Sequence, residues 1–160
     1  FPILRYADVL LMFAEAENQI NGPTAAAQAA VNQVRRRGYG RTDVLAPYVL
    51  SDAATTAASS SKPAFQQFIE DERMRELCFE GLRKMDLIRW NKFVATMKAV
   101  SDDMAAAPTS GPLTSGNQQY GALAGRNVFT GGDKFLLFPI PSLEMASNPL
   151  ITKEDQNPGW

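Results

Sequence analysis

The chain has 160 residues, of which 45% are hydrophobic and 21% charged, and its formal net charge is −1. This length and composition are those of an ordinary globular protein with a core of its own. The near-neutral charge argues against nucleic acid as a partner, because binding phosphates needs an excess of basic residues.

The longest apolar run, Val9 to Ala14, lies between Asp8 and Glu15. A membrane-spanning helix needs about 20 apolar residues, so the sequence predicts no segment that crosses a bilayer. There is no histidine, and Cys78 is the only cysteine. We therefore expect no zinc-type metal site, no disulfide within the chain and no cofactor. Cys78 lies among apolar neighbours and is interpreted as a small buried side chain.

The first two elements are predicted to form a helical hairpin. Residues 4–20 have the helical period and are apolar on more than one side, which is typical of a helix buried between neighbours. After a turn at 21–23, Thr24 is placed to cap a second helix that ends near Gly38. The hairpin, 34 residues long, matches the period of the tetratricopeptide repeat. Because one such unit cannot bury its apolar faces alone, we expect further units to stack on it.

The middle of the chain is predicted to contain a loop and a second hairpin. Residues 39–63 include two prolines and a run of alanine, serine and threonine, which indicates an exposed loop with at most one helical turn near Asp52. A helix is then predicted over 64–80, followed by a tight turn at Gly81 and another helix over 83–100.

Residues 105–133 are rich in glycine and polar side chains, which predicts a long loop. Loops of this length are usually functional or disordered. Within it lie three amides and one aromatic ring, the chemistry that carbohydrate recognition uses. The alternative is a solvated polar loop without a ligand. The candidate ligand-binding residues are Asn117, Gln118, Gln119 and Tyr120.

The C-terminal stretch, residues 135–160, is predicted to be an extended strap. Its four prolines prevent a regular helix or strand. Several of its side chains are too apolar to be left in water, since burying each stabilises the fold by about 1.5–3 kcal/mol. We therefore expect the strap to pack in an ordered form across the helices. These side chains are Phe135, Leu137, Phe138, Ile140 and Leu150.

Charged residues on the predicted helix 64–80 allow two interpretations. Glu72, Glu76 and Glu80 recur at i, i+4 and i+8 and would line one helix face, where a glycosidase could use two of them. Oppositely charged residues three positions apart favour ion pairs that also tie adjacent helices together, so no catalytic residue is assigned. The other members of this set are Arg73, Arg83 and Asp86.

Three consecutive arginines, 35 to 37, close the second predicted helix. Cations are favourable at the negative end of a helix dipole, so capping and ion pairing are favoured here over an anion site. Arg35 or Arg37 is expected to pair with a carboxylate of the first helix, namely Asp8, Glu15 or Glu17.

Three stretches in order carry a resemblance to a known family. RYADVLLMFAEAEN at 5–18 is followed by VNQVRRRG at 31–38, and ERMRELCFEGLRKMDLIRW lies at 72–90. FPIPSLEMASNPLI at 138–151 is the third stretch, and QNPGW at 156–160 closes the chain. In this order and spacing they resemble the C-terminal region of the SusD/RagB family.

The resemblance implies both a fold and a function. The fold is all-α, with tetratricopeptide-like helical hairpins, long irregular loops and an extended C-terminal strap. Residues 1–160 would form a single C-terminal region of a protein whose N-terminal part is absent. Members of the family are lipoproteins at the outer membrane of Gram-negative bacteria and face outward. They bind oligosaccharides or peptides for a SusC-like TonB-dependent transporter, and the lipid anchor would lie outside this chain.

The leading interpretation is a non-enzymatic nutrient-binding lipoprotein of the outer membrane, with a glycan as the favoured nutrient. One alternative is a tetratricopeptide-type scaffold that recognises protein segments in a groove. Another is a carboxylate-based glycosidase. The stretches at 138–151 and 156–160 favour the first interpretation over the scaffold, because an ordinary repeat array has no need of them.

Overall fold

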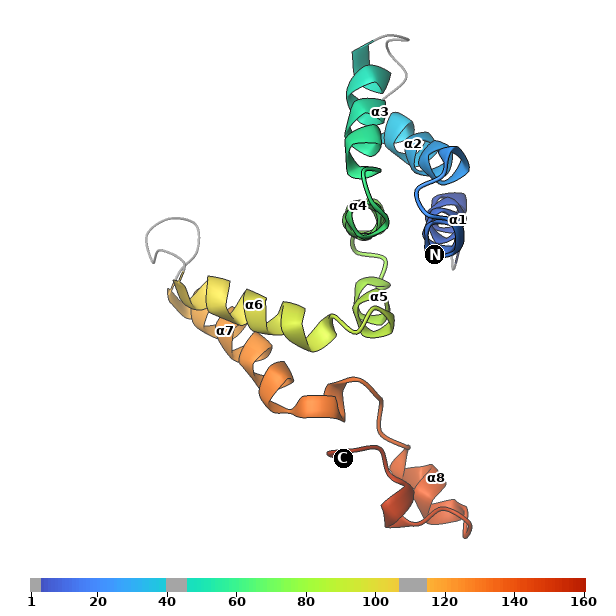
Figure 1. Ribbon diagram of the computed structural model, residues 1–160. Helices are drawn as coiled ribbons and strands as arrows, with labels where there is room; N and C mark the ends of the chain where they lie inside the picture. The colour runs from blue at the N-terminus through green and yellow to red at the C-terminus, as the bar shows by residue number, and fades with distance from the viewer. Residues whose placement is uncertain (1–3, 40–45, 107–114) are drawn as a thin grey trace. The chain divides into compact units, whose positions relative to one another are not determined.

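The structure, a computed structural model, describes residues 4–39, 46–106 and 115–160, and their side chains except those of 46–51, 115–119, 129, 132 and 133. The described residues form α-helices and two short 3-10 helices, and no β-strand occurs among them (Figure 1). The predicted all-α fold is confirmed. The chain consists of two compact units, Phe1–Arg83 and Lys84–Trp160.

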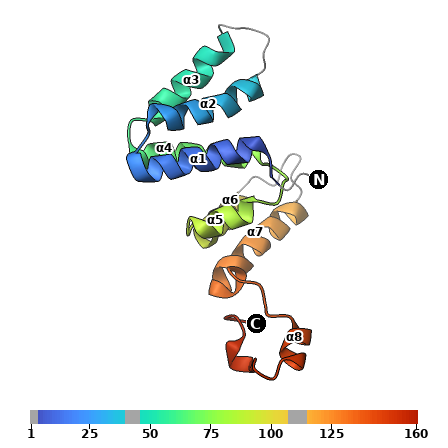
Figure 2. The ribbon, with the colours of Figure 1, turned by 90° about the vertical axis from the view of Figure 1, so that its right-hand side faces the viewer.

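The first unit contains two pairs of helices. They are α1 (Tyr6–Asn21), α2 (Ala25–Tyr39), α3 (Ala46–Ala58) and α4 (Lys62–Glu76). α1 and α3 each pack against both α2 and α4 (Figures 1 and 2). The first predicted hairpin is confirmed as α1 and α2. A further helix pair stacks on it, as expected for a repeat unit, but that pair is α3 and α4 instead of the one predicted.

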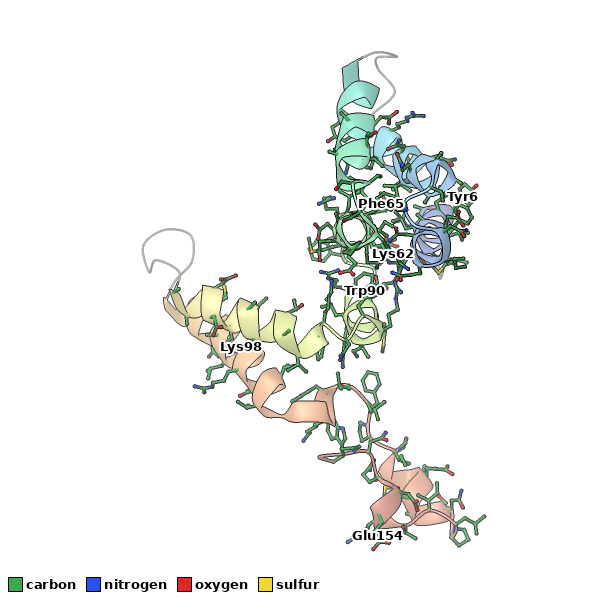
Figure 3. All side chains as sticks on the ribbon, viewed as in Figure 1. Tyr6, Lys62, Phe65, Trp90, Lys98 and Glu154 are labelled. Atoms are coloured by element: carbon green, nitrogen blue, oxygen red, sulfur yellow. The ribbon has the colours of Figure 1, made fainter. Side chains whose placement is uncertain are left out.

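The core of the first unit combines small residues on α1 and α2 with larger ones on α4. Alanines where α1 meets α2 let the two backbones approach closely. Phe65 on α4 is labelled in Figure 3 and has no exposed surface. Its ring stacks on that of Phe68, with the ring centroids 6.5 Å apart. Each large side chain buried in this way stabilises the fold by about 1.5–3 kcal/mol. The core residues are Ala7, Leu11, Ala14, Ala27, Ala30, Val31, Val34, Phe65 and Ile69.

α3 lies in a stretch that was expected to be an exposed loop, so that prediction is wrong over Ala46–Ala58. Residues 40–45 lie outside the described part. Serine and threonine favour turns when a segment is considered alone, but alanine is the best helix former. Packing against α2 and α4 then decides the outcome, and Thr55 is wholly buried.

α4 ends at Glu76, earlier than predicted, and residues 77–82 form the turn that follows it. Leu77 is buried at this turn. Cys78 is exposed, so the expected burial of its side chain is wrong. Gly81 has a φ of 80°, and Phe79 has a φ of 64°. Glycine adopts this left-handed region without a clash, whereas a bulky side chain is strained there.

The helix predicted over 83–100 is divided into α5 (Arg83–Arg89) and α6 (Phe93–Ala106). α5 ends in the hydrogen-bond pattern of a Schellman motif. The backbone N–H of Lys92 donates to the carbonyl of Leu87 (2.8 Å), and that of Asn91 donates to the carbonyl of Ile88 (2.9 Å). Asn91 has a φ of 56°, which asparagine tolerates better than most residues. The asparagine is therefore the sequence signal for the break.

α7 (Ser115–Thr130) packs closely along α6. A Cβ atom added at the buried Gly125 would lie 2.6 Å from the carbonyl oxygen of Met97. The Ser101 hydroxyl donates to the carbonyl of Ala122 (2.8 Å) across the same contact. The loop predicted over 105–133 is therefore wrong over α7, where glycine serves close helix packing. Residues 107–114 lie outside the described part.

Residues 134–160, here called the C-terminal segment, contain the end of η1 (Gly132–Phe135), then α8 (Ser142–Ser147) and η2 (Lys153–Asp155). Three of the apolar side chains expected to be packed are 52%, 65% and 87% exposed, namely Leu137, Phe138 and Leu150. Phe135 and Ile140 are partly buried. The predicted burial of the strap is therefore wrong for those three side chains.

Polar side chains fasten the C-terminal segment instead. Oε1 of Gln156 accepts a hydrogen bond from the backbone N–H of Ile140 (2.7 Å), and Nε2 donates to the carbonyl of the same residue (3.1 Å). The indole N–H of Trp160 donates to the carbonyl oxygens of Lys134 (3.0 Å) and Leu137 (3.2 Å). The end of the chain is thus tied to the beginning of the segment.

Candidate functional site

The predicted ligand-binding residues lie in the first turns of α7. Their backbone is helical, and the side chains of 117–119 are outside the described part. The side chain of Tyr120 is 76% exposed, so the face of its ring is accessible to a ligand. The assignment of Asn117, Gln118, Gln119 and Tyr120 to ligand binding stays a prediction.

A hollow of about 370 Å³ lies on the α6–α7 pair. Leu123 lines it and follows Tyr120 by three positions, which makes the two residues neighbours on the helix surface. The exposed Arg126 also lines it. An apolar wall and a guanidinium group, with an aromatic residue one helical turn away, are a combination that can hold a small polar ligand with apolar faces. The complete lining is Ser101, Ala105, Ala122, Leu123 and Arg126. The hollow could not be predicted from the sequence, because the polar and glycine-rich composition of 115–130 does not indicate the helix α7.

A second hollow, of about 400 Å³, lies between α1 and α2 in the first unit. It is lined mainly by apolar atoms and includes Tyr6, which is largely exposed and projects outward from α1 (Figure 3). Both arginines at its edge already have partners, since Arg5 pairs with Glu76 (2.8 Å) and Arg37 pairs with the same carboxylate. The hollow therefore presents chiefly an apolar surface. Its lining is Arg5, Tyr6, Ala7, Leu10, Gln33, Val34 and Arg37.

The charged residues of α4 form ion pairs with the neighbouring helices. Arg73 pairs with Asp8 on α1 (2.7 Å), and each side chain is less than a tenth exposed. Arg35 on α2 pairs with Glu72 (2.7 Å), also in a buried position. The predicted ion pairing is confirmed for these residues, and it includes partners on adjacent helices. Pairs three positions apart also occur, between Glu72 and Arg75 (2.9 Å) and between Asp86 and Arg89 (2.9 Å). Removing one partner would leave a buried charge without its counter-ion, which is strongly destabilising.

Glu80 lies beyond the end of α4, so the three glutamates do not line one helix face as predicted. Arg5 holds Glu80 through two hydrogen bonds, from Nε to Oε2 (2.9 Å) and from Nη2 to Oε1 (2.6 Å). These bonds lower the pKa of Glu80, and together with those to Glu76 they raise the pKa of Arg5. A carboxylate held ionised in this way is poorly suited to act as the general acid of a glycosidase.

The three arginines at the end of α2 reach α3 and α4. Arg35 pairs with Glu72, Arg36 with Asp52 and Arg37 with Glu76. The pairing role predicted for them is confirmed, but the expected partners on α1 are wrong. Asp8 pairs with Arg73, and Glu17 accepts hydrogen bonds from its near neighbours Asn21 and Thr24. The actual partners follow from helix stacking, which sequence spacing does not reveal.

Across residues 4–39, 46–106 and 115–160, none of the helices combines the length and the apolar character that spanning a membrane requires. Over the same ranges, no group of three or more carboxylate and thiol side chains is placed to hold a metal ion.

Comparison with known proteins identifies the family. The sequence profile of the SusD family matches residues 1–160. The chain belongs to the SusD family. Two relatives from Formosa agariphila, "SusD-like protein P38" and "SusD-like protein P25", are 38% identical to it over 100 and 88 residues. These matches cover 62% and 55% of this chain but only 18% and 15% of the relatives.

A solved structure extends this comparison to the fold. The crystal structure of a SusD homolog from Bacteroides thetaiotaomicron is 35% identical to this chain in sequence and superposes with a TM-score of 0.73. The match covers 99% of this chain and 26% of the homolog. The chain therefore corresponds to about a quarter of that relative, and the family resemblance inferred from the three motif stretches is confirmed.

Proposed function

We propose that this chain is part of a non-enzymatic nutrient-binding protein that captures glycans at the cell surface. The observation that carries the proposal is the match of the SusD family to all of residues 1–160, supported by the structural likeness to a SusD homolog. In this proposal the chain supplies a rigid helical frame and part of a ligand surface.

The ligand surface is the beginning of α7 with the hollow beside it. Pyranose rings have apolar faces that stack on aromatic rings, and their hydroxyl groups bond to amides and guanidinium groups. Tyr120 offers an exposed ring, Arg126 lies on the wall of the hollow, and residues 117–119 contribute three amides by sequence. The close α6–α7 contact at Gly125 gives these side chains a rigid support.

Glycan binding by matched variants tests this site. Tyr120→Ala removes the stacking ring and should weaken binding to an oligosaccharide about tenfold, because aromatic contacts contribute up to about 1.5 kcal/mol. Tyr120→Phe keeps the ring and should bind nearly as the parent protein does. Calorimetric titration against oligosaccharides selected on a glycan array gives both affinities. Equal affinities for the parent protein and Tyr120→Ala would remove Tyr120 from the site.

The same proposal includes a SusC-like TonB-dependent transporter as partner and an outer-membrane location. The lipid anchor would lie outside these 160 residues. Metabolic labelling with an alkyne fatty acid, followed by protease treatment of intact cells, tests the anchor and the outward orientation. Purification in mild detergent should recover the transporter with the tagged protein. An unlabelled protein that protease cannot reach in intact cells would contradict the location.

A glycosidase remains the alternative with a different chemistry. The ion pairs formed by Glu72, Glu76 and Glu80 support binding over catalysis, since each carboxylate has an arginine partner. Incubation of the protein with the glycans that it binds, followed by chromatography of the products, separates the two functions. We expect the glycans to be recovered intact.

We also propose that residues 1–160 form one C-terminal region of a longer protein whose upstream helices cover α1. Apolar side chains on α1 at Tyr6, Val9 and Phe13 are exposed and recur at the spacing of one helix face. The hollow between α1 and α2 adjoins them through Tyr6. Repeat units bury such faces by stacking, and the solved SusD homolog is long enough to supply the missing units.

A further inference from the structure

The turn at 77–82 presents a large aromatic side chain in an unfavourable way. Phe79 has a φ of 64°, and its ring is fully exposed, at 101% of the reference area. A bulky residue is rare in this backbone region, and strain of this kind persists only where the surroundings enforce it. The ring contributes nothing to the core of the first unit, so this unit gains nothing from phenylalanine here.

The chain itself shows the less strained solution. Asn91 occupies the same left-handed region, with a φ of 56°, where α5 ends. Asparagine and glycine tolerate this conformation because their small or polar side chains avoid the clash with the backbone. A turn whose only task was to connect α4 with α5 would be more stable with either residue at position 79. The phenylalanine therefore points to a contact beyond the first unit.

The surroundings hold the backbone on both sides of Phe79. Leu77 is buried on one side of it, and on the other side Glu80 receives two hydrogen bonds from Arg5. The backbone N–H of Glu80 also donates to the carbonyl of Leu77 (3.2 Å). A backbone that is held in place before docking lowers part of the entropy cost of docking, and aromatic anchors are typical of interfaces.

We propose that Phe79 inserts into an apolar pocket on the part of the longer protein outside these 160 residues. Continuity favours this occupant over an external partner. Arg5, which holds the turn through Glu80, also lines the hollow beside Tyr6 on the exposed side of α1. The body that covers α1 therefore adjoins the turn as well. This inference rests on the proposal that the chain is part of a longer protein, of which the solved homolog supplies a precedent in length.

Replacing Phe79 by asparagine in the longer protein gives a test in which the two possibilities have opposite signs. If the ring is exposed, Phe79→Asn relieves strain and leaves the Tm unchanged or raises it. If the ring is docked, the lost burial exceeds the relief, and the Tm falls by several degrees. Phe79→Leu keeps an apolar side chain in the same strained backbone and should lie between the parent protein and Phe79→Asn.

Cys78 provides a second readout that needs no change of stability. Its thiol is exposed in the 160 residues, so docking of the turn should slow its alkylation at least tenfold relative to the urea-unfolded protein. The rate is followed on the peptide containing Cys78 by mass spectrometry, and Phe79→Asn should accelerate it. An unchanged or raised Tm in Phe79→Asn, together with rapid alkylation of Cys78 in the parent protein, would overturn the inference. A loss of glycan binding in Phe79→Asn without a loss of stability would overturn it as well.

A variant on α1 separates this inference from the architecture on which it rests. Phe13→Ser places a polar group on the exposed face of α1 and should lower the Tm if upstream helices cover that face. A lowered Tm in Phe13→Ser together with an unaffected Phe79→Asn would refute the docking of Phe79 alone. If neither variant lowers the Tm, the proposed covering of α1 fails as well.

Discussion

The four helices α1–α4 and the C-terminal segment 134–160 are both rich in apolar residues, yet different interactions hold them. In α1–α4 the apolar side chains meet one another, and Leu11, Val31, Phe65 and Ile69 have no exposed surface. In the C-terminal segment several large apolar side chains face solvent, while side-chain amides and the indole N–H bind the backbone. The first region is held by burial and the second by directed hydrogen bonds.

This difference matters for function because each type of stabilisation leaves a different surface. Burial inside α1–α4 covers much of the apolar area, and the outer face of α1 keeps exposed apolar side chains for further packing. In the C-terminal segment, hydrogen bonds from side chains hold the backbone, while Leu143, Leu150 and other apolar side chains stay exposed. If the chain is part of a longer protein, as proposed above, both exposed surfaces are available to the remainder of the molecule.

The largest expected effect comes from the core of α1–α4. Phe65→Ala should lower the free energy of unfolding by about 3–5 kcal/mol, because it removes a wholly buried ring and leaves a cavity. Leu150→Ala, at an exposed position in the C-terminal segment, should change it by less than about 0.5 kcal/mol. Urea unfolding followed by circular dichroism measures both. Similar losses in the two variants would show that the C-terminal segment is packed after all.

Buried ion pairs should come next. Arg73→Ala leaves Asp8 buried without its counter-ion, which typically costs about 3–5 kcal/mol, reduced here to the extent that water enters the space. Replacing both residues together, as Asp8→Leu with Arg73→Met, should recover most of the loss because no isolated charge remains. The same unfolding measurement applies. A double variant as unstable as Arg73→Ala would mean that the pair itself, and not the avoided charge burial, stabilises α1 against α4.

In the C-terminal segment the corresponding change removes the hydrogen bonds between Gln156 and Ile140. Gln156→Ala loses both hydrogen bonds to Ile140, and each is worth about 0.5–1.5 kcal/mol net. Hydrogen exchange at the Ile140 amide should accelerate, while the amides of α1 and α4 keep their rates. Leu143→Ala, which removes exposed apolar area and no hydrogen bond, is the matched control and should leave Ile140 protected. If the Ile140 amide stayed protected from exchange in Gln156→Ala, the hydrogen bonds of Gln156 would not be needed to hold the segment.

Sequence reasoning succeeded where periodicity and tertiary packing agree. The period of 3.6 residues predicted α1, α2 and α4, and Thr24 does cap α2 by accepting from the N–H of Ala27 (3.3 Å). It failed where tertiary packing overrides local preference. α3 and α7 are rich in serine, threonine or glycine, and they become helical against a partner helix that the sequence does not reveal.

The candidate site shows the same limit. Sequence composition selected residues 117–120 as polar and aromatic, and Tyr120 is indeed exposed. The hollow beside it depends on α6 and α7 lying together, with Ser101 and Leu123 brought into one surface. The ion pairs of α2 with α4 likewise join residues 37 and 39 positions apart. The polar or aromatic character of a residue can be read from the sequence. Contacts between residues that are far apart in the sequence follow only from how the helices pack.

The smallest expected effect concerns pH, and it again separates the two regions. Hydrogen bonds from Arg5 lower the pKa of Glu80 below its ordinary value of 4.5. In the C-terminal segment, the backbone N–H and hydroxyl of Thr152 lower the pKa of Asp155 below its ordinary value of 3.8. A carboxyl with a lowered pKa in the folded state contributes stability above its unfolded pKa. That contribution is lost as the pH falls through the folded pKa.

Acidification from pH 7 to pH 3 should therefore loosen both regions, each through its own carboxyl. Glu80→Gln should remove part of the pH dependence from the exchange rates of α1 and of the turn at 77–82, after correction for intrinsic rates, and leave η2 unaffected. Asp155→Asn should do the reverse, because its partners lie within three residues and do not touch α1. Both changes are small, since the groups are near solvent, where water screens the interaction. Asp155→Asn could instead alter the pH response of α1 as strongly as Glu80→Gln does. The two regions would then be stabilised together, and the contrast between burial in one and hydrogen bonding in the other would not describe this protein.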